Sequence, residues 1–393
     1  MATTCLSYHP TELDAVRFWA KQHGKKATET DLPTGYPREL HSPLAWTRAE
    51  VEKKKSEWVL ELSKEDVKEI DAALAMFEAH SDELSDISID TFSLPSSLSQ
   101  RLKQVSTQCY TGIGFKIVRG IDPSKYTPKQ NAAVYAGLAA HVAPQRGFVD
   151  RSYEGVLAHI VNVAGENPEA ESKAPGFTNT HLSFHSDNCE IMGLYCLDTA
   201  SEGGRTLVSS SWQLYNQLAA KRPDVLKTLA ETWVLDTFKD YQKSPPLSVP
   251  FLDRVSGESV LLRFSRYPIT GWQRKRNPAL PAPTQAQLEA IDAVQFTAAA
   301  NSVPLPMGKG DIVFVNDMAM LHAREAFSEG GEYMKRHLLK MFFRDPEQNW
   351  QVPVSAVAGW KKMYGPNRAD GSRHETWCTR YEAGMEEEAP TNG

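Results

Sequence analysis

The stretch Asn179–Tyr195, NTHLSFHSDNCEIMGLY, lies where the chain turns from helical to β-rich sequence, and it carries His185 and Asp187 two residues apart. Side chains two apart in an extended segment lie on the same face, so one imidazole and one carboxylate can point at a single metal ion. The pattern is weak by itself, because about one chance His-x-Asp occurrence is expected in a chain of 393 residues with 11 histidines.

A second His-x-Asp pair, His80 and Asp82 in FEAHSDELSD, tests the value of the pattern. The preceding sequence predicts a helix, which begins near Ser63 with a capping-box pattern and continues with apolar residues at helical spacing. Residues two apart on a helix point in different directions, so they cannot face one metal ion. We therefore exclude this copy and retain His185 and Asp187.

Short β-rich runs dominate the chain from about Val156 onward, and two stretches with a helical pattern interrupt them. The runs are VLAHIVNV, EIMGLYCLDT, RTLVSS, LSVPFLD, SVLLRFSRY, SVPLPM, DIVFVND and RHLLKMFF. Many short strands with few helices are typical of a sandwich or barrel and not of a parallel α/β sheet. Further helices are expected at Leu98–Cys109 and from Thr127. The sequence therefore predicts a mainly β (α+β) fold with flanking helices.

The chain divides into three expected parts. Residues 1–95 form an N-terminal extension whose helices pack on the core, residues 96–350 form the core domain, and residues 351–393 form a C-terminal segment. The last part of that segment, EAGMEEEAPTNG, is acidic and of low complexity, which predicts a disordered tail. The loop Ala164–Thr180 is long, polar and rich in proline and glycine, and such loops often act as lids.

The composition excludes several classes of protein. With 41% hydrophobic and 23% charged residues and a net charge of −6, the chain is ordinary globular sequence without the basic face of a nucleic-acid or membrane-surface binder. No apolar run reaches the roughly 20 residues of a membrane span, and the N-terminus has no secretory pattern. Five scattered cysteines indicate reduced thiols. We expect a cytoplasmic protein.

A third metal ligand has a candidate in GDIVFVNDMAMLHAREAF, where His322 follows the expected strand Ile312–Val315. Two histidines and one carboxylate with open positions form the facial triad of non-haem Fe(II) oxygenases. The alternative is that His322 is a surface or helix-end histidine without a ligand role.

The segment YMKRHLLKMFFRDPE favours the metal interpretation. As a strand it places Arg336, Leu338, Lys340 and Phe342 on one face, and both faces are largely apolar, so the strand is expected to be buried. A buried arginine needs an anionic partner, and the planar guanidinium suits a carboxylate. That partner is either a ligand or a carboxylate of the protein itself.

Four segments together resemble a known family. His185-Ser186-Asp187, Gly203-Gly204-Arg205-Thr206, the Gly310–His322 segment and Arg336 are similar, in order and spacing, to the motifs of the TauD/TfdA family of Fe(II)- and 2-oxoglutarate-dependent dioxygenases, over roughly residues 100–350. The N-terminal extension and RHLLKMFFRDPEQNW look most like the fungal branch. The resemblance implies a double-stranded β-helix, the jelly-roll core of cupin-like proteins.

The resemblance also implies roles for individual residues. It implies that His185, Asp187 and His322 ligate Fe(II) and form the catalytic centre. Thr206 and Arg336 match the residues that bind the distal carboxylate of 2-oxoglutarate, a co-substrate consumed together with O2 to give succinate and CO2.

The sequence identifies candidate substrate-binding residues less specifically than it identifies the metal and 2-oxoglutarate ligands. Lys340 shares the face of Arg336, which suggests an anionic substrate, although a lysine can also extend to solvent. His181, four residues before His185, and Phe342 are further candidate substrate contacts. Their alternatives are a hydrogen-bonded loop histidine and a core aromatic residue.

The expected reaction is hydroxylation of an unactivated C–H bond in a small anionic substrate, such as an amino acid, carboxylate or sulfonate. Oxidative cyclisation, for example aziridine formation, or desaturation of an amino acid in fungal secondary metabolism is an alternative. A non-redox, cupin-like metal-binding protein is an alternative of another class. A small anionic molecule is the expected binding partner. The sequence is also compatible with a homo-oligomer.

Overall fold

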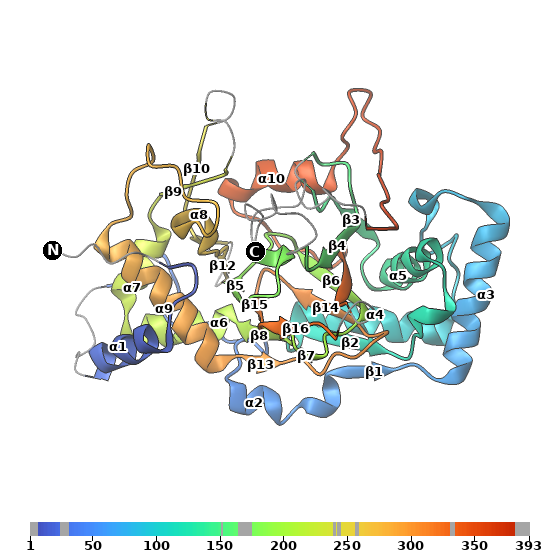
Figure 1. Ribbon diagram of the computed structural model, residues 1–393, viewed down its shortest axis with the longest axis horizontal. Coiled ribbons are helices and arrows are strands. Elements are labelled where there is room, and N and C mark those ends of the chain that lie inside the picture. The colour runs from blue at the N-terminus through green and yellow to red at the C-terminus, as the bar shows by residue number, and fades with distance from the viewer. Residues whose placement is uncertain are drawn as a thin grey trace.

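A computed structural model gives the fold, and it describes residues 7–23, 31–150, 152–163, 175–238, 241, 245–255, 259–330 and 335–381. Two β-sheets form the centre of the molecule (Figure 1), with helices α3 and α5 at one end of the view and α1, α7 and α9 at the other. The predicted acidic tail, residues 382–393, and most of the predicted lid, residues 164–174, lie outside the described residues.

The larger sheet has the strand order β1-β2-β14-β6-β17-β3, and β4 also pairs with β17. Every pairing in it is antiparallel except β1 with β2. Its strands are β1 (Val59–Glu61), β2 (Phe115–Arg119), β3 (Gln145–Gly147), β4 (Ala158–Val161), β6 (Ile191–Asp198), β14 (Ile312–Asn316) and β17 (His337–Arg344).

The smaller sheet is antiparallel and has the order β13-β8-β15-β5. Its strands are β5 (Leu182–His185), β8 (Thr206–Ser210), β13 (Val303–Pro304) and β15 (Met320–Arg324). Three two-stranded pairs complete the β structure: β7 (Glu202–Gly203) with β16 (Phe327–Ser328), β9 (Trp233–Leu235) with β10 (Leu247–Val249), and β11 (Leu252–Arg254) with β12 (Val260–Leu262).

Strand β17 separates two hydrophobic cores. Leu338 and Phe342 belong to the core that also contains residues of the smaller sheet, whereas Leu339, Met341 and Phe343 belong to the core beneath the helices α3, α4 and α5. Alternate side chains of a strand point to opposite faces, so this division confirms the predicted parity and burial of the strand. The face of Leu338 is therefore the inner face of the larger sheet.

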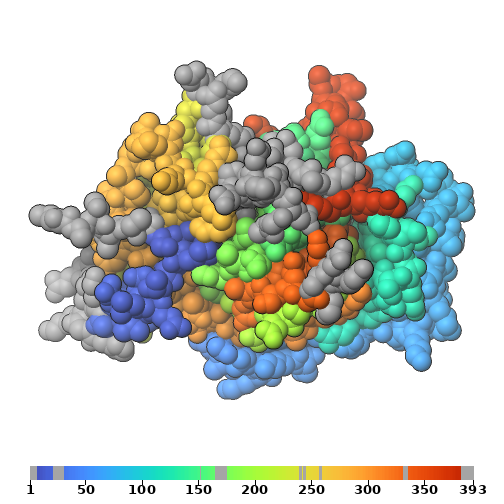
Figure 2. Space-filling model, in the orientation of Figure 1, coloured from blue at the N-terminus to red at the C-terminus, as the bar shows by residue number. Residues whose placement is uncertain are grey.

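Two groups of helices cover the sheets. Helices α4 and α5 pack with α3 on the outer face of the larger sheet, and α6 and α9 pack on the smaller sheet. Figure 2 shows the N-terminal helix α1, in dark blue, against the orange segment that contains α9. The helices are α1 (Glu12–His23), α2 (Arg48–Glu52), α3 (Lys64–His80), α4 (Ser96–Thr111), α5 (Pro128–Val142), α6 (Ser211–Lys221), α7 (Pro223–Ala230), α8 (Tyr267–Thr270), α9 (Gln285–Asn301) and α10 (Val354–Tyr364). Single 3-10 turns lie at Lys55–Glu57, Leu84–Asp86, Pro123–Lys125 and Pro175–Phe177.

The three predicted early helices are confirmed. Helix α3 begins with the predicted capping box of Ser63 and Asp66, and Thr127 caps α5 in the same way. The predicted β-sheet core with flanking helices is also confirmed, but the fold is a mixture of helix and sheet with more helix than predicted. The polar region before residue 60 forms α1 and α2, and the C-terminal segment forms α10. None of the helices in the described ranges is both long and apolar enough to span a bilayer.

Candidate active site

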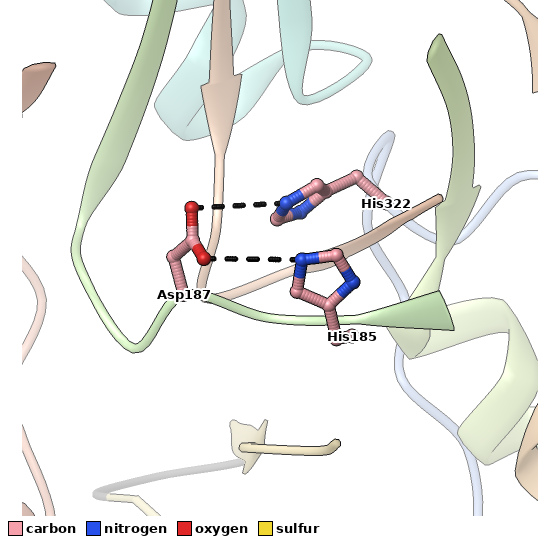
Figure 3. A group of neighbouring side chains, drawn as sticks. All are labelled: His185, Asp187 and His322. Atoms are coloured by element: carbon pink, nitrogen blue, oxygen red, sulfur yellow. Dashed lines mark ion pairs between the residues drawn. The ribbon is translucent and has the colours of Figure 1, made fainter. Parts of the chain in front are cut away.

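His185 and His322 face each other across neighbouring strands of the smaller sheet. They are register partners in the antiparallel pair β5–β15, and their ring centroids lie 4.1 Å apart. Directly opposed residues of such a pair project from the same face of the sheet. The strand pairing therefore brings the two imidazoles together, as Figure 3 shows.

Asp187 completes the group from the loop that follows β5. Its Oδ1 lies 3.9 Å from His185 Nε2 and its Oδ2 lies 3.7 Å from His322 Nε2 (Figure 3). One potential ligand atom from each of the three residues lies within 4.8 Å of the others. All three side chains are buried. Residues that the sequence analysis grouped as a candidate triad are thus close together in space.

The protonation of the triad suits a divalent metal ion. His185 Nδ1 donates to the carbonyl of Ser183 at 2.9 Å, which leaves the lone pair of Nε2 free to bind a metal ion. Burial lowers the pKa of His185 to about 3 and that of His322 to about 4, so both rings are neutral at pH 7. Burial opposes ionisation of Asp187, but the charge of Lys340, which also donates a hydrogen bond to this carboxylate, outweighs burial and holds the pKa of Asp187 below its usual value. Two neutral imidazoles and one carboxylate fit Fe(II).

Asp317 is a neighbour of the triad that the sequence analysis missed. Its Oδ1 lies 3.4 Å from His322 Nδ1, and neither of these buried atoms has a hydrogen-bond partner among the described residues. Its Oδ2 accepts a hydrogen bond from the backbone N–H of Cys189. A carboxylate behind a ligand histidine fixes the ring and its tautomer. Local sequence offered no signal for this role, because Asp317 and His322 lie on either side of a turn.

A cavity of about 70 Å3 opens beside the two histidines. Thr206, the first residue of β8, and Arg336, the residue before β17, both line it. Arg336 is buried, and its Nε donates to the carbonyl of Gly204 at 3.2 Å, but no carboxylate of the described residues pairs with it. Burial lowers the pKa of Arg336 to about 10, so the guanidinium remains charged at pH 7. Of the two predicted partners, the described residues therefore favour an anionic ligand.

Arg324 is a second buried arginine in the same cavity, and the sequence analysis did not single it out. Its guanidinium donates to the carbonyls of Gly176 and Thr180 and lies over the ring of Phe327. Strand parity was the available signal, because Arg324 lies two residues after His322 in β15. The cavity thus presents two arginines and a lysine, which favours a ligand with negative charge.

The three predicted substrate contacts lie in different places. Lys340 lines the small cavity and donates to Asp187 Oδ2 at 2.9 Å. Phe342 lines a second cavity together with Asp187. His181 belongs to the lining of neither cavity, and its Nε2 lies 2.7 Å from Nδ1 of His9 in the N-terminal segment. Two of the three residues are therefore next to the triad.

Comparison with known proteins identifies the family. The sequence model described as "Taurine catabolism dioxygenase TauD, TfdA family" matches residues 65–342. The chain belongs to the TauD/TfdA family. It is therefore an Fe(II)- and 2-oxoglutarate-dependent non-haem iron dioxygenase that uses O2, and the non-redox alternative no longer applies.

Two relatives of known sequence support this membership. The chain is 32% identical over 348 residues to the taurine hydroxylase-like protein SAT17 of Stachybotrys chartarum, with 86% of this chain and 89% of that protein covered. It is 26% identical over 275 residues to FR-33289 synthase of Streptomyces rubellomurinus, covering 65% of this chain and 77% of the relative.

Solved structures share the fold. Asparagine oxygenase in complex with Fe(II), hydroxyasparagine and succinate aligns with a TM-score of 0.57 at 16% identity, covering 75% of this chain and 98% of that chain. The oxygenase OrfP in complex with iron and 2-oxoglutarate aligns with a TM-score of 0.53 at 14% identity, covering 73% and 94%.

Proposed function

We propose that His185, Asp187 and His322 hold the Fe(II) ion, and that Thr206 and Arg336 hold the distal carboxylate of 2-oxoglutarate. The observation that carries this proposal is the buried Arg336, which lies in a cavity beside the triad without a carboxylate partner among the described residues. An uncompensated buried charge is costly, so an anionic ligand belongs there. Together, bound iron and 2-oxoglutarate supply the activation of O2 for attack on a C–H bond.

The residues around the triad position the reactants and exclude water. The Lys340 ammonium holds Asp187, and the Ser183 carbonyl holds His185. The apolar side chains of Leu194 and Leu338 line the small cavity and keep water from its polar groups. In this arrangement a carboxylate ligand meets Arg336 in a site of low polarity, where its attraction is strong.

We infer that the two sheets form the double-stranded β-helix predicted for residues 96–350. The support is that Leu338 and Phe342 of the larger sheet share one hydrophobic core with Val208 and Leu321 of the smaller sheet. This face-to-face arrangement of two sheets with side chains between them is the general plan of a jelly roll.

The proposed reaction is hydroxylation of an unactivated C–H bond of an anionic small molecule, with release of succinate and CO2. We propose an amino acid as the substrate class. The support is that asparagine oxygenase, which shares this fold, is known in complex with a hydroxylated amino acid, as is OrfP.

Anaerobic spectroscopy tests the co-substrate site. Addition of Fe(II) and 2-oxoglutarate to the protein is expected to give a weak visible charge-transfer band, and Asp187→Ala is expected to lose both this band and turnover. A wild-type protein without the band would overturn the proposal. A screen of amino acids and sulfonates for substrate-dependent succinate release then tests the substrate class.

A further inference from the structure

A second cavity, of about 440 Å3, adjoins the triad on the side of Asp187. Asp187 and Phe342 line it, whereas His185 and His322 line the small cavity, so the triad lies between the two. Its volume falls in the usual range for small-molecule sites, roughly 300–1,000 Å3. It therefore has room for a substrate larger than the co-substrate, next to the proposed iron.

One wall of this cavity is helix α10. Ser355, Gly359 and Lys362 line the cavity and follow each other at helical spacing, so they form one stripe of the helix. Gly359 lies in the middle of the stripe, and a Cβ atom added there would meet no atom within 4 Å. Glycine is among the poorest helix formers, and the open space in front of it keeps the cavity wide.

This wall lies outside the part of the chain that the family model matches. That match ends at residue 342, and α10 begins at Val354. The helix nevertheless packs close to the core, because Trp360 is buried and Tyr364 Oη donates to the carbonyl of Phe343. The cavity wall is thus a feature of this chain that the family motifs do not determine.

The lining of the cavity is mainly apolar. Phe342 from β17, Val249 from β10 and Trp360 from α10 belong to it, and Phe148 lines it from the loop after β3. Apolar and aromatic walls with a few polar groups are typical of sites that bind an apolar molecule in one orientation. A small, strongly hydrated sulfonate would leave most of this surface without a partner.

Arg263 and Lys362 are the basic residues in the lining of this cavity, and Arg263 is the one that lies near the triad. Its Nη2 donates to Asp253 at 2.7 Å and to Ser355 at 2.8 Å, and its Nε is buried without a partner among the described residues. The next residue, Phe264, exchanges two hydrogen bonds with Ser186, between the ligands His185 and Asp187. A guanidinium with spare donors near the triad suits a carboxylate.

We propose that this cavity binds the oxidisable substrate as an α-amino acid with a large apolar side chain, whose carboxylate meets Arg263 and whose side chain lies against Gly359, Phe342 and Trp360. The inference rests on the oxygenase function proposed above and names the substrate class for the same site. Gly359 is then a specificity-determining position, because a bulky side chain there takes the place of the substrate, whereas a single Cβ atom meets nothing within 4 Å.

Binding to the wild-type protein tests the substrate class. Titration calorimetry is done without O2 on protein loaded with Fe(II) and 2-oxoglutarate, with L-phenylalanine and L-leucine as apolar probes and L-asparagine and taurine as polar ones. We expect at least one apolar probe to bind 10-fold or more tightly than both polar probes, and the amide of that probe, which lacks the carboxylate, to bind about 10-fold more weakly. Equal or tighter binding of taurine or asparagine, or an amide that binds as tightly as the acid, would overturn the proposal.

Gly359→Phe tests the wall, with Gly359→Ala as the matched control. Phenylalanine fills the open space, so we expect a loss of 10-fold or more in affinity for the apolar probe, whereas alanine should change it less than twofold. Unchanged affinity in Gly359→Phe contradicts the inference. The visible band with Fe(II) and 2-oxoglutarate distinguishes failure of the proposed oxygenase function from failure of this substrate class. Absence of the band from the wild type would overturn the proposed function. A band without a preference for apolar probes would overturn only the substrate class.

Discussion

Lys340 of β17 donates a hydrogen bond of 2.9 Å to Asp187 Oδ2, and both side chains are largely buried. The contact joins strand β17 of the larger sheet to the loop after β5, which carries one of the proposed metal ligands. Lys340 also lines the cavity that contains Thr206 and Arg336. Its charge is therefore available to the co-substrate site as well as to Asp187.

Lys340→Met is expected to weaken the binding of 2-oxoglutarate about 10-fold, because hydrogen bonds to charged groups contribute about 1.5–3 kcal/mol. Titration of the visible band gives this affinity. Lys340→Arg retains the positive charge and should lose less affinity for 2-oxoglutarate than Lys340→Met. The Michaelis constant for the substrate should stay within twofold in both variants, and a large increase there with unchanged 2-oxoglutarate affinity would instead assign Lys340 to the substrate.

Arg336→Gln should nearly abolish 2-oxoglutarate binding. Removing one partner of a buried ion pair costs about 2–5 kcal/mol, so we expect the dissociation constant to rise at least about 30-fold. The matched control is Arg205→Gln. Arg205 is exposed and pairs with Glu325 at the surface, where ion pairs contribute little. Equal effects of the two substitutions would remove Arg336 from the co-substrate site.

Asp317→Asn should weaken metal binding, although Asp317 is not one of the proposed metal ligands. Loss of the carboxylate behind His322 removes the group that orients the ring, and such changes cost about 10–100-fold in metal affinity. Titration with Mn(II) in the absence of O2 measures the effect apart from turnover. A dissociation constant equal to that of the wild type would show that His322 is held by its strand alone.

Metal binding should stabilise the fold. A metal at 100 times its dissociation constant contributes about 2.7 kcal/mol, so Mn(II) is expected to raise the melting temperature by several degrees. His185→Ala should abolish this increase. His80→Ala is the control from the second His-x-Asp pair, where His80 Nδ1 instead lies 2.7 Å from the Met76 carbonyl at the end of α3. A loss of the increase in His80→Ala would contradict the choice between the two pairs.

Local sequence periodicity predicted much of this arrangement. The alternation along β17 placed Arg336, Lys340 and Phe342 beside the two cavities, and this inference needs only the geometry of one strand. The helix argument against the second His-x-Asp pair was wrong in its premise, because α3 ends at His80 and Asp82 lies beyond it. Asp82 instead forms an ion pair with Lys129.

Contacts between distant segments could not be predicted in this way. The contact between His181 and His9 joins residues that are 172 positions apart in the sequence, and no local pattern predicts it. Helix α10 was missed although a local signal existed, because Ala356, Trp360 and Tyr364 recur at helical spacing and are buried together on one face. Arg324 had a parity signal, but only the fold shows that its face borders the cavity.

The direct opposition of His185 and His322 across β5 and β15 has a consequence for assembly of the enzyme. A slip of one residue in this pairing would turn Leu321 or Ala323 toward the triad and the imidazole toward the opposite side. A chain with this slip would lack one of the proposed ligands. The register of the smaller sheet therefore decides whether the proposed iron site can form.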